Sequence, residues 1–321
     1  MALAREGSKE DVFRESETDC TVHLDQQRIA RNGAIPSFFV VGPPRTGTSW
    51  LHDVLSDHVS LPAPTKETRF FDLNFHRGWD WYFDHFPDAG NGRTVGEVAP
   101  TYFASRQARS LIARWVPDAQ IVFIFRNPIE RLVSLYRLKL AYGTLACGFD
   151  VALERDPELL ESSLYASTLR EWKSIFPQRR LSINLYDDLN NNPRGFVEDL
   201  ASFLNIPRFA LHESRLAQIY STKQMTEPRS YLATKAATAM ADWCKARKLD
   251  NVVAAVKNSV LIKLFLGGGA PFSDIPARSL RKASALLLRE TEELEAMIGR
   301  DLSAWKQPIT KCGAHDGEPN N

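Results

Sequence analysis

A strand, a glycine-framed loop and a helix follow one another between residues 38 and 51, and this succession constrains the fold more than any other feature. The segment reads FFVVGPPRTGTSWL. Gly42 and Gly47 are separated by four residues, and Ser49 follows shortly after. This is the spacing of the motif G-x-x-x-x-G-K-[ST], in which backbone N–H groups and a helix N-terminus surround a phosphate. The segment therefore predicts an anion-binding loop between a buried strand and a helix.

The lysine of that motif is replaced here by Thr48, and the cation of the loop is Arg45. The missing lysine is the group that reaches the β- and γ-phosphates of a nucleoside triphosphate. Arginine instead presents a planar fork of donors that suits a phosphate or a sulfate. We therefore expect the loop to bind an anion other than ATP or GTP.

The length and charge of the chain fit a single large domain. The chain has 321 residues and a mass of 36.2 kDa, which is enough to bury one sizeable core. Its 40 basic residues nearly balance 39 acidic ones, so no overall field indicates nucleic acid as a partner. We expect a partly ordered lead-in at residues 1–35, one domain at 36–306 and a frayed tail at 307–321.

Neither metal binding nor a membrane anchor is indicated. The cysteines form no C-x-x-C pair, which predicts reduced thiols and no zinc site; they are Cys20, Cys147, Cys244 and Cys312. The N-terminus is charged and lacks the apolar core of a signal peptide. No apolar run approaches the roughly 20 residues that span a bilayer. We expect a soluble, cytoplasmic protein without a transmembrane segment.

Short apolar strands alternate with amphipathic helices, which predicts an α/β fold of three layers. A P-loop-like central sheet, mainly parallel, would have helices on both faces and a helical C-terminal extension. The strands are expected at 38–41, 95–98, 120–126 and 181–186. Helices are expected around 24–29, 108–115, 129–142, 164–176, 196–204, 231–246, 252–266 and 277–298.

A second strand also ends in a cationic turn and continues into a helix. The segment IVFIFRNPIERLVSLYR places Arg126 at the end of the strand and Ser134 on the helix. Ligands of parallel α/β sheets bind at the carboxyl ends of the strands, so Arg126 and the first loop should face one crevice. Two neighbouring anion sites indicate a ligand with two separated anionic groups. Alternatively, Arg126 caps a sheet edge and Ser134 is an ordinary residue of a helix surface.

The segments GPPRTGTSWL and FRNPIERLVSLYR resemble the two cofactor motifs of the sulfotransferases that use 3′-phosphoadenosine 5′-phosphosulfate (PAPS). The resemblance extends to KETRFFD at 66–72, to VGEVAPTYF at 95–103 and to a run that begins SLYASTLREWKSIF at 163. These blocks are similar to those of heparan sulfate, tyrosylprotein and related bacterial sulfotransferases. The similarity covers roughly residues 37–206, and residues 289–305 resemble the usual C-terminal helix and tryptophan.

The resemblance implies a role for each residue of the cofactor motifs. Arg45 would lie against the oxygen that bridges phosphate and sulfate and would stabilise charge on the leaving phosphate. Arg126 and Ser134 would bind the 3′-phosphate. Further cofactor contacts are implied for Thr46, Gly47, Thr48, Ser49, Trp50 and Tyr165. Capping of the following helix is an alternative role for Thr48 and Ser49, and a place in the core is the alternative for Tyr165.

The catalytic base implied by the resemblance is Glu67, which matches the family's glutamate before two phenylalanines. A base is needed to take the proton from the attacking hydroxyl or amine of the acceptor. Desolvation in a cleft would raise the pKa of this carboxyl, whereas Lys66 and Arg69 beside it would lower it. The alternative is that Glu67 forms a surface ion pair with one of these cations.

Other residues near these blocks are weaker candidates for a role in the site. Histidine is the base in cytosolic small-molecule sulfotransferases, but the local histidines fit helix faces and packing better; they are His52, His58, His76 and His85. Val98 stands where heparan-type enzymes usually have lysine, which argues against heparan-like substrate chemistry. Two roles are open for Glu97: orienting local backbone or acceptor groups, or forming a structural salt bridge.

Aromatic residues crowd the segment 70–86, and such a cluster lines an acceptor pocket or, more commonly, belongs to the core. We expect most of them to be buried; they are Phe70, Phe71, Phe75, Trp79, Trp81, Tyr82, Phe83 and Phe86. Lys223 and Arg229 lie where relatives place a basic loop over the cofactor, and they are the candidates for a lid.

The sequence thus predicts a sulfotransferase that moves a sulfuryl group from PAPS to a hydroxyl or amine and releases adenosine 3′,5′-bisphosphate without a metal. The acceptor would be a glycan, a lipid, a peptide or a small natural product. Two other functions stay open. A P-loop nucleotide kinase or NTPase is disfavoured by the missing lysine and by the lack of an acidic Mg²⁺ ligand after the strand at 120–126. A silent module that binds an anionic nucleotide is the other.

Overall fold

The computed structural model describes residues 35–220, 226–228, 230–246 and 270–307. Within them, four strands form one sheet: β1 (Phe38–Val40), β2 (Gly96–Val98), β3 (Gln120–Phe125) and β4 (Leu181–Leu185). Their order across the sheet is β2-β1-β3-β4, and every pairing is parallel. The predicted parallel α/β sheet is confirmed, and each strand is one residue shorter than the sequence predicted. The expected lead-in and tail, and the helices expected at 24–29 and 252–266, lie almost entirely outside the described residues.

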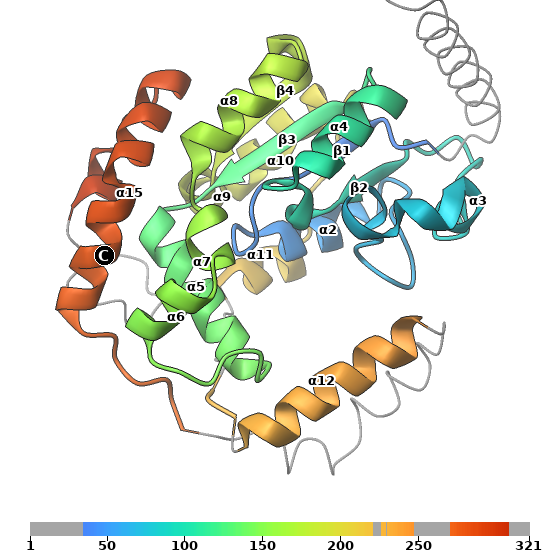
Figure 1. Ribbon diagram of the computed structural model, residues 1–321. Helices are drawn as coiled ribbons and strands as arrows, with labels where there is room; N and C mark the ends of the chain where they lie inside the picture. Colours follow the sequence, from blue (N-terminus) through green and yellow to red (C-terminus); the bar gives the residue numbers. More distant parts are fainter. Residues whose placement is uncertain (1–34, 221–225, 229, 247–269, 308–321) are drawn as a thin grey trace, which may run out of the picture.

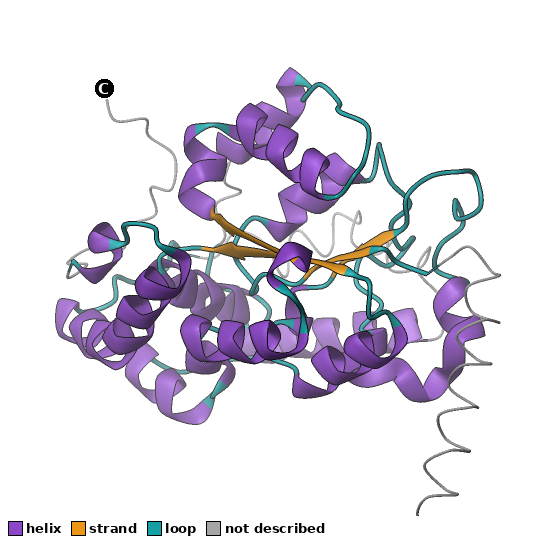
Figure 2. Cartoon of the chain, turned by 90° about the horizontal axis from the view of Figure 1, so that it is seen from above, coloured by secondary structure: helices purple, strands orange, loops and turns teal. Residues whose placement is uncertain are grey.

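The sheet is the middle of three layers, with helices on both of its faces (Figure 2). Alternate residues of β3 face opposite sides: Phe123 and Phe125 pack toward α4 (Arg106–Trp115) and α8 (Tyr165–Ile175). Val122 and Ile124 pack toward α2 (Thr48–Leu55) and α10 (Pro193–Phe203). Because both faces are covered, all the residues of β3 are buried and its sequence is apolar along most of its length.

The remaining described helices cover the ends and sides of this core. They are α3 (Gly78–Phe83), α5 (Pro128–Ala141), α6 (Phe149–Arg155), α7 (Glu158–Glu161), α9 (Tyr186–Asn191), α11 (Glu213–Tyr220), α12 (Tyr231–Ala246) and α15 (Ala277–Ile298). Short helical turns lie at η1 (Phe70–Asn74), η2 (Phe75–Arg77), η3 (Pro100–Tyr102), η4 (Gln178–Arg180) and η5 (Ser303–Lys306). α12, in orange, lies at one end of the molecule beyond α5 (Figure 1).

The predicted C-terminal helix is confirmed as α15, which runs along α8 and α5 at one side of the molecule (Figure 1). Glu290 accepts a hydrogen bond from the backbone N–H of Ser167 at 3.0 Å, and Glu293 pairs with Arg170 at 2.7 Å. Beyond the helix, the indole N–H of Trp305 donates to Asp187 at 2.9 Å. The C-terminal segment therefore fixes the start of α9, which follows directly after β4.

The strand order reverses between β1 and β3. β1 is followed in the chain by β2, which lies on one side of it, whereas β3 lies on its other side and continues to β4. The two strands also approach closely, because a Cβ added to Gly42 would lie 2.4 Å from the backbone nitrogen of Ile124. Ligands of open α/β sheets bind outside the carboxyl ends of the strands at such a reversal. The loop after β1 and Arg126 after β3 both lie at this point.

Candidate active site

The loop after β1 leads directly into α2, and Gly47 is the N-cap of that helix. Gly47 has φ of +86°, a conformation that glycine adopts without strain. Gly47 has no side chain that could accept hydrogen bonds from the first turn of α2. The first N–H groups of α2 are therefore available to an anion. Thr48 and Ser49 lie within the helix rather than at the cap.

Two further residues of the first motif fix the loop and its helix. Thr46 is completely buried, and its hydroxyl donates to the carbonyl oxygen of Pro43 at 2.8 Å. The indole N–H of Trp50 donates to the carbonyl oxygen of Arg215, in α11, at 2.8 Å. The side-chain polar groups of both residues therefore serve the structure of the site, and any ligand contact from Thr46 would come from its backbone.

Arg45 joins the two anion-binding motifs. Its Nε donates to the hydroxyl oxygen of Ser134 on α5 at 2.9 Å, across 89 positions of the sequence. Arg45 has φ of +75°, so the loop holds a non-glycine residue in the left-handed region at this position. This contact brings the two motifs side by side, and Ser134 is more than an ordinary residue of a helix surface.

Arg126 lies at the carboxyl end of an inner strand, so the alternative of a sheet-edge cap is wrong. Its side chain is buried, and Glu130 accepts hydrogen bonds from its Nε and Nη2 at 3.2 and 3.1 Å. The guanidinium lies over the ring of Tyr186, 4.8 Å from the centroid. The same ring lies 3.1 Å from where a Cβ of Gly47 would be, so Tyr186 borders both motifs.

The sequence reasoning missed Tyr186 and Glu130. Tyr186 follows β4, at the same carboxyl edge of the sheet as the two motifs, and this placement was the available signal. Glu130 lies four positions after Arg126 on a helix, a spacing at which opposite charges pair.

Tyr165 lies in the core behind Arg126. It is almost completely buried, stacks on Phe125 with 4.7 Å between the ring centroids, and donates its hydroxyl to the carbonyl oxygen of Arg126 at 3.0 Å. Burial raises the pKa of Tyr165 to about 12, so the hydroxyl keeps its proton. The structure thus gives Tyr165 the core position considered as its alternative, from which it positions the backbone of Arg126.

Glu67 is partly buried, and its two cationic neighbours are engaged elsewhere. Lys66 pairs with Asp53 at 2.5 Å, and Arg69 pairs with Asp72 at 2.7 Å. The surface ion pair considered for Glu67 is therefore not what the structure shows. Burial, followed by the negative charge of Glu97, raises the pKa of Glu67 to about 7 despite the opposing effects of Arg69 and Lys66. A carboxyl with this pKa changes its charge near neutral pH.

Glu97 is completely buried behind the segment that carries Glu67, and it orients local backbone, which is one of the roles considered for it. Its Oε1 accepts from the backbone N–H and the hydroxyl of Thr68 at 3.1 and 2.6 Å. The hydroxyls of Tyr82 and Tyr102 donate to the same carboxylate at 2.8 and 3.2 Å. These donors are uncharged, so Glu97 forms a hydrogen-bonded anchor rather than a salt bridge or an acceptor contact.

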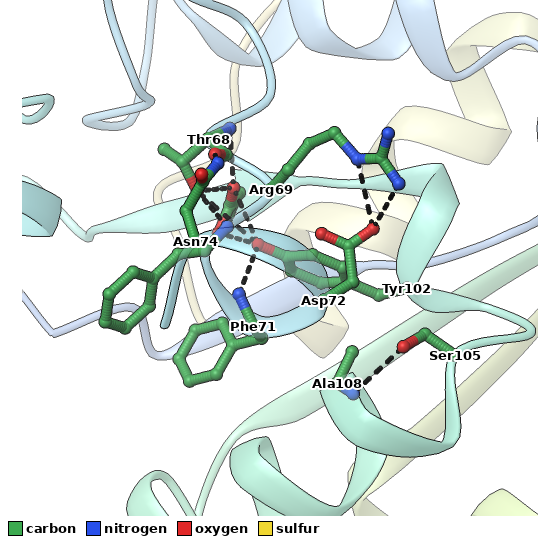
Figure 3. A network of polar contacts seen from close by, with 10 residues as sticks. Thr68, Arg69, Phe71, Asp72, Asn74, Tyr102, Ser105 and Ala108 are labelled. Atoms are coloured by element: carbon green, nitrogen blue, oxygen red, sulfur yellow. Dashed lines mark hydrogen bonds and ion pairs between the residues drawn. The ribbon is translucent and has the colours of Figure 1, made fainter. Parts of the chain in front are cut away.

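This hydrogen-bonded anchor fixes the backbone that directly follows Glu67. Figure 3 shows Thr68, Asn74 and Tyr102 converging, with the amide of Asn74 donating to the carbonyl oxygen of Thr68 at 2.9 Å. The backbone N–H of Phe71 donates to the Tyr102 hydroxyl at 3.3 Å. Thr68 is thus held through its N–H, its carbonyl and its hydroxyl, and the adjacent Glu67 starts from a fixed backbone.

The remaining candidates divide between packing and residues outside the described part. His58 stacks on Phe209 with 3.7 Å between centroids, and His85 contacts the carbonyl oxygen of Trp81 at 2.8 Å. His52 is buried on α2, which lowers its pKa. The aromatic cluster belongs to the core, but half of its rings are buried rather than most of them: Phe70, Phe71, Tyr82 and Phe86 are buried, and the other four are partly buried and pack against them. The proposed lid residues Lys223 and Arg229 lie outside the described residues.

Residues 36–249 match the model of the sulfotransferase domain family. The chain belongs to this family. It is 33% identical over 198 residues to bifunctional heparan sulfate N-deacetylase/N-sulfotransferase 2 of Bos taurus, covering 54% of this chain and 22% of that protein. It is 27% identical over 183 residues to heparan sulfate glucosamine 3-O-sulfotransferase 3B1 of Mus musculus, covering 54% of this chain and 47% of that protein. The matches thus span less than half the length of these relatives.

A solved structure has the same fold. The sulfotransferase from Alicyclobacillus acidocaldarius superposes with a TM-score of 0.60 at 21% identity, over 85% of this chain and 100% of that chain. The family match argues against the P-loop kinase or NTPase. The uncapped start of α2, Arg45 with Ser134, and Arg126 fit a ligand with two anionic ends. No described helix has the length and apolarity to cross a bilayer.

Proposed function

We propose that this sulfotransferase transfers the sulfuryl group of PAPS to a hydroxyl or amine of a small molecule, glycan or lipid, with Glu67 as the base. One observation supports this more than any other. A cavity of about 330 Å³ is lined by Pro44 of the anion-binding loop and by Arg69 and Asp72 of the Glu67 loop. An acceptor in this cavity would lie between the donor loop and the segment that carries the base.

Arg126, Ser134 and Arg45 would hold the donor by its two anionic ends. Arg126, supported by Glu130 and Tyr186, provides a charge-assisted contact for the 3′-phosphate. Ser134 accepts from Arg45, so its own hydroxyl hydrogen points elsewhere and can be donated to a phosphate oxygen. Arg45 and the first N–H groups of α2 would stabilise charge on the phosphate as the bond to sulfur breaks. PAPS supplies the activated sulfuryl group.

Glu67 would remove the proton of the attacking group on the acceptor. With a pKa of about 7, its carboxyl is a stronger base than an ordinary glutamate and is still half ionised at neutral pH. Its backbone is fixed by the Glu97 anchor through Thr68. A fixed base shortens the search for the reactive geometry, which is a main source of rate enhancement when no metal takes part.

The test combines binding and turnover. Calorimetry with adenosine 3′,5′-bisphosphate should show binding, and a radiolabelled sulfuryl donor should label an acceptor in a host-cell metabolite extract. Glu67→Gln should lower kcat by roughly 10²- to 10⁴-fold with unchanged affinity for the bisphosphate. Glu198→Gln, at an exposed glutamate of α10, is the matched control and should keep wild-type turnover. Full turnover by the Glu67→Gln variant would remove Glu67 from the role of base.

A further inference from the structure

The cavity between the anion-binding loop and the segment after Glu67 indicates what kind of acceptor the enzyme binds. Its walls come from four parts of the chain: Pro44 of the anion-binding loop, residues 69–73 of the Glu67 loop, residues 100–105 around η3, and α7 with its flanking residue Ser162. Its volume of about 330 Å³ is at the small end of the range for ligand pockets. The part of an acceptor that lies inside it is therefore no larger than a small molecule or a single sugar unit.

The charges in the walls do not favour an anion. Arg69 is the cation among the described lining residues, and both its Nε and its Nη2 donate to Oδ2 of Asp72, at 3.1 and 2.7 Å. Glu158 is the other charged lining residue, and Lys139 pairs with it at 2.6 Å. The lining thus contributes one positive and two negative side chains, and each of the three is already paired. A sulfated or carboxylated acceptor would find no cation among the described lining residues that is not already engaged with a carboxylate.

Two polar atoms of the lining lack a partner among the described residues. They are Oδ1 of Asp72, whose side chain is 6% exposed, and the hydroxyl of Thr101. Both atoms have almost no accessible surface, so an acceptor in the cavity does not reach them. The selectivity of the cavity therefore depends on the rest of its lining.

The rest of the lining is largely apolar. Leu73 is 55% exposed at the cavity, and Pro44, Pro100, Phe103 and Ala104 complete the apolar surface. An exposed leucine gains free energy when a ligand covers it, and a highly hydrated polyanion would not provide that cover. The cavity thus presents a largely apolar surface in which the charged side chains are already paired.

We infer that the acceptor is a compact alcohol or amine with an apolar portion and without negative charge, rather than a polyanionic glycan. This inference rests on the proposed function. In the reaction, the acceptor oxygen or nitrogen bonds to sulfur as the sulfur–oxygen bond to the phosphate breaks. The acceptor proton passes to the Glu67 carboxylate, and adenosine 3′,5′-bisphosphate leaves with the electron pair. Leu73 covers the apolar portion of the acceptor.

The first experiment compares acceptors that differ in charge. A metabolite extract is separated on an anion exchanger at pH 7 before the reaction, and each fraction is incubated with enzyme and labelled donor. Label should enter the unretained fraction, which holds neutral and cationic compounds. Tyramine, 4-hydroxyphenylacetate and an N-sulfated heparan-type oligosaccharide are tested in parallel, and tyramine, the one compound of the three without negative charge, should give the highest kcat/KM. Label confined to the retained fraction, or a preference for the oligosaccharide, would overturn the inference.

The second experiment changes the cavity itself. Asp72→Asn leaves Arg69 without its neutralising partner, so the preference for cationic over anionic acceptors should fall roughly tenfold. Asp80→Asn, at an exposed aspartate of α3, is the charge-matched control and should leave the preference unchanged. Leu73→Ser, at an exposed site that does not endanger folding, should raise KM for the labelled acceptor several-fold. An unchanged preference in Asp72→Asn together with an unchanged KM in Leu73→Ser would overturn the inference.

Binding of adenosine 3′,5′-bisphosphate separates this inference from the proposed function. Both cavity variants should bind the bisphosphate as tightly as the wild type, because neither residue belongs to the anion-binding motifs. If the wild type binds the bisphosphate and labels only anionic acceptors, the inference fails while the proposed function stands. If no fraction of the extract takes label, both fail.

Discussion

Glu67 links the activity of the enzyme to its stability, and Glu67→Gln tests that link at several pH values. The pKa of Glu67 is raised from its ordinary 4.5 to about 7 by burial and by the charge of Glu97. A group whose pKa is raised on folding contributes stability that is present below pH 4.5 and is lost as the pH rises through about 7. At alkaline pH the native protein therefore holds an ionised carboxylate in a site that disfavours it.

The magnitude follows from the size of the rise. The pKa of Glu67 rises from 4.5 to about 7, and each pKa unit corresponds to about 1.4 kcal/mol. Ionised Glu67 is therefore less favourable in the folded protein than in the unfolded chain by about 3 kcal/mol. Glutamine cannot ionise and has nearly the same shape. The free energy of unfolding of Glu67→Gln, relative to the wild type, should therefore rise by about 3 kcal/mol between pH 4 and pH 8.

Urea denaturation of both proteins at pH 4, 5, 6, 7 and 8 provides the measurement, and the pH-dependent part of the difference is the quantity of interest. A constant offset reflects altered packing or hydrogen bonding and carries no information about the pKa. Glu198→Gln, at an exposed position, should give a difference that does not change with pH. The reasoning is refuted if the difference between Glu67→Gln and the wild type is equally flat. If it holds, the variant is more stable than the wild type at pH 8 and nearly inactive.

Three further predictions concern the anchor, the donor site and the fold. Glu97→Gln removes the negative charge behind Glu67, so the ascending limb of kcat/KM against pH should move to lower pH; Tyr82→Phe keeps that charge and should leave the limb in place. Arg126→Ala should weaken the binding of adenosine 3′,5′-bisphosphate roughly 10- to 100-fold in calorimetry, because a charge-assisted contact is lost and Glu130 is left unpaired. Arg155→Ala, at an exposed site of α6, is the control and should bind the bisphosphate as the wild type does. Gly42→Ala places a methyl group 2.4 Å from the backbone of Ile124 and should lower the free energy of unfolding by about 1–3 kcal/mol in urea; an unchanged value would mean that β1 and β3 separate more readily than their packing indicates.

The sheet was predictable because its signals are local. The two inner strands, β1 and β3, are short and mainly apolar, and a strand buried on both faces shows this pattern in its own residues. The crevice was predictable for a related reason. Once two strands are parallel, their carboxyl ends lie at one edge, and Arg45 and Ser134 meet there although 89 positions separate them.

The contacts that tune the site were not predictable, because they depend on which distant side chains meet. Glu97 is anchored by Tyr82 and Tyr102 through the packing of the aromatic cluster, and nothing in the spacing of these residues fixes that meeting. Tyr186 reaches Arg126 because β4 pairs with β3, while Trp305 holds the adjacent Asp187 across 118 positions. Such partners are selected by tertiary packing, which a single sequence does not encode in a periodic pattern.

The arrangement of Glu67 and Glu97 explains why a buried carboxylate lies behind a proposed base. An apolar side chain in place of Glu97 would leave Thr68, Tyr82 and Tyr102 without their acceptor and release the backbone next to Glu67. A cation would hold the opposite charge against Glu67 and lower its pKa, making it a weaker base. A carboxylate satisfies the donors and raises the pKa of Glu67 at once. Both effects require that Glu97 stay buried, so the aromatic cluster that encloses it contributes to the chemistry of the site as well as to the core.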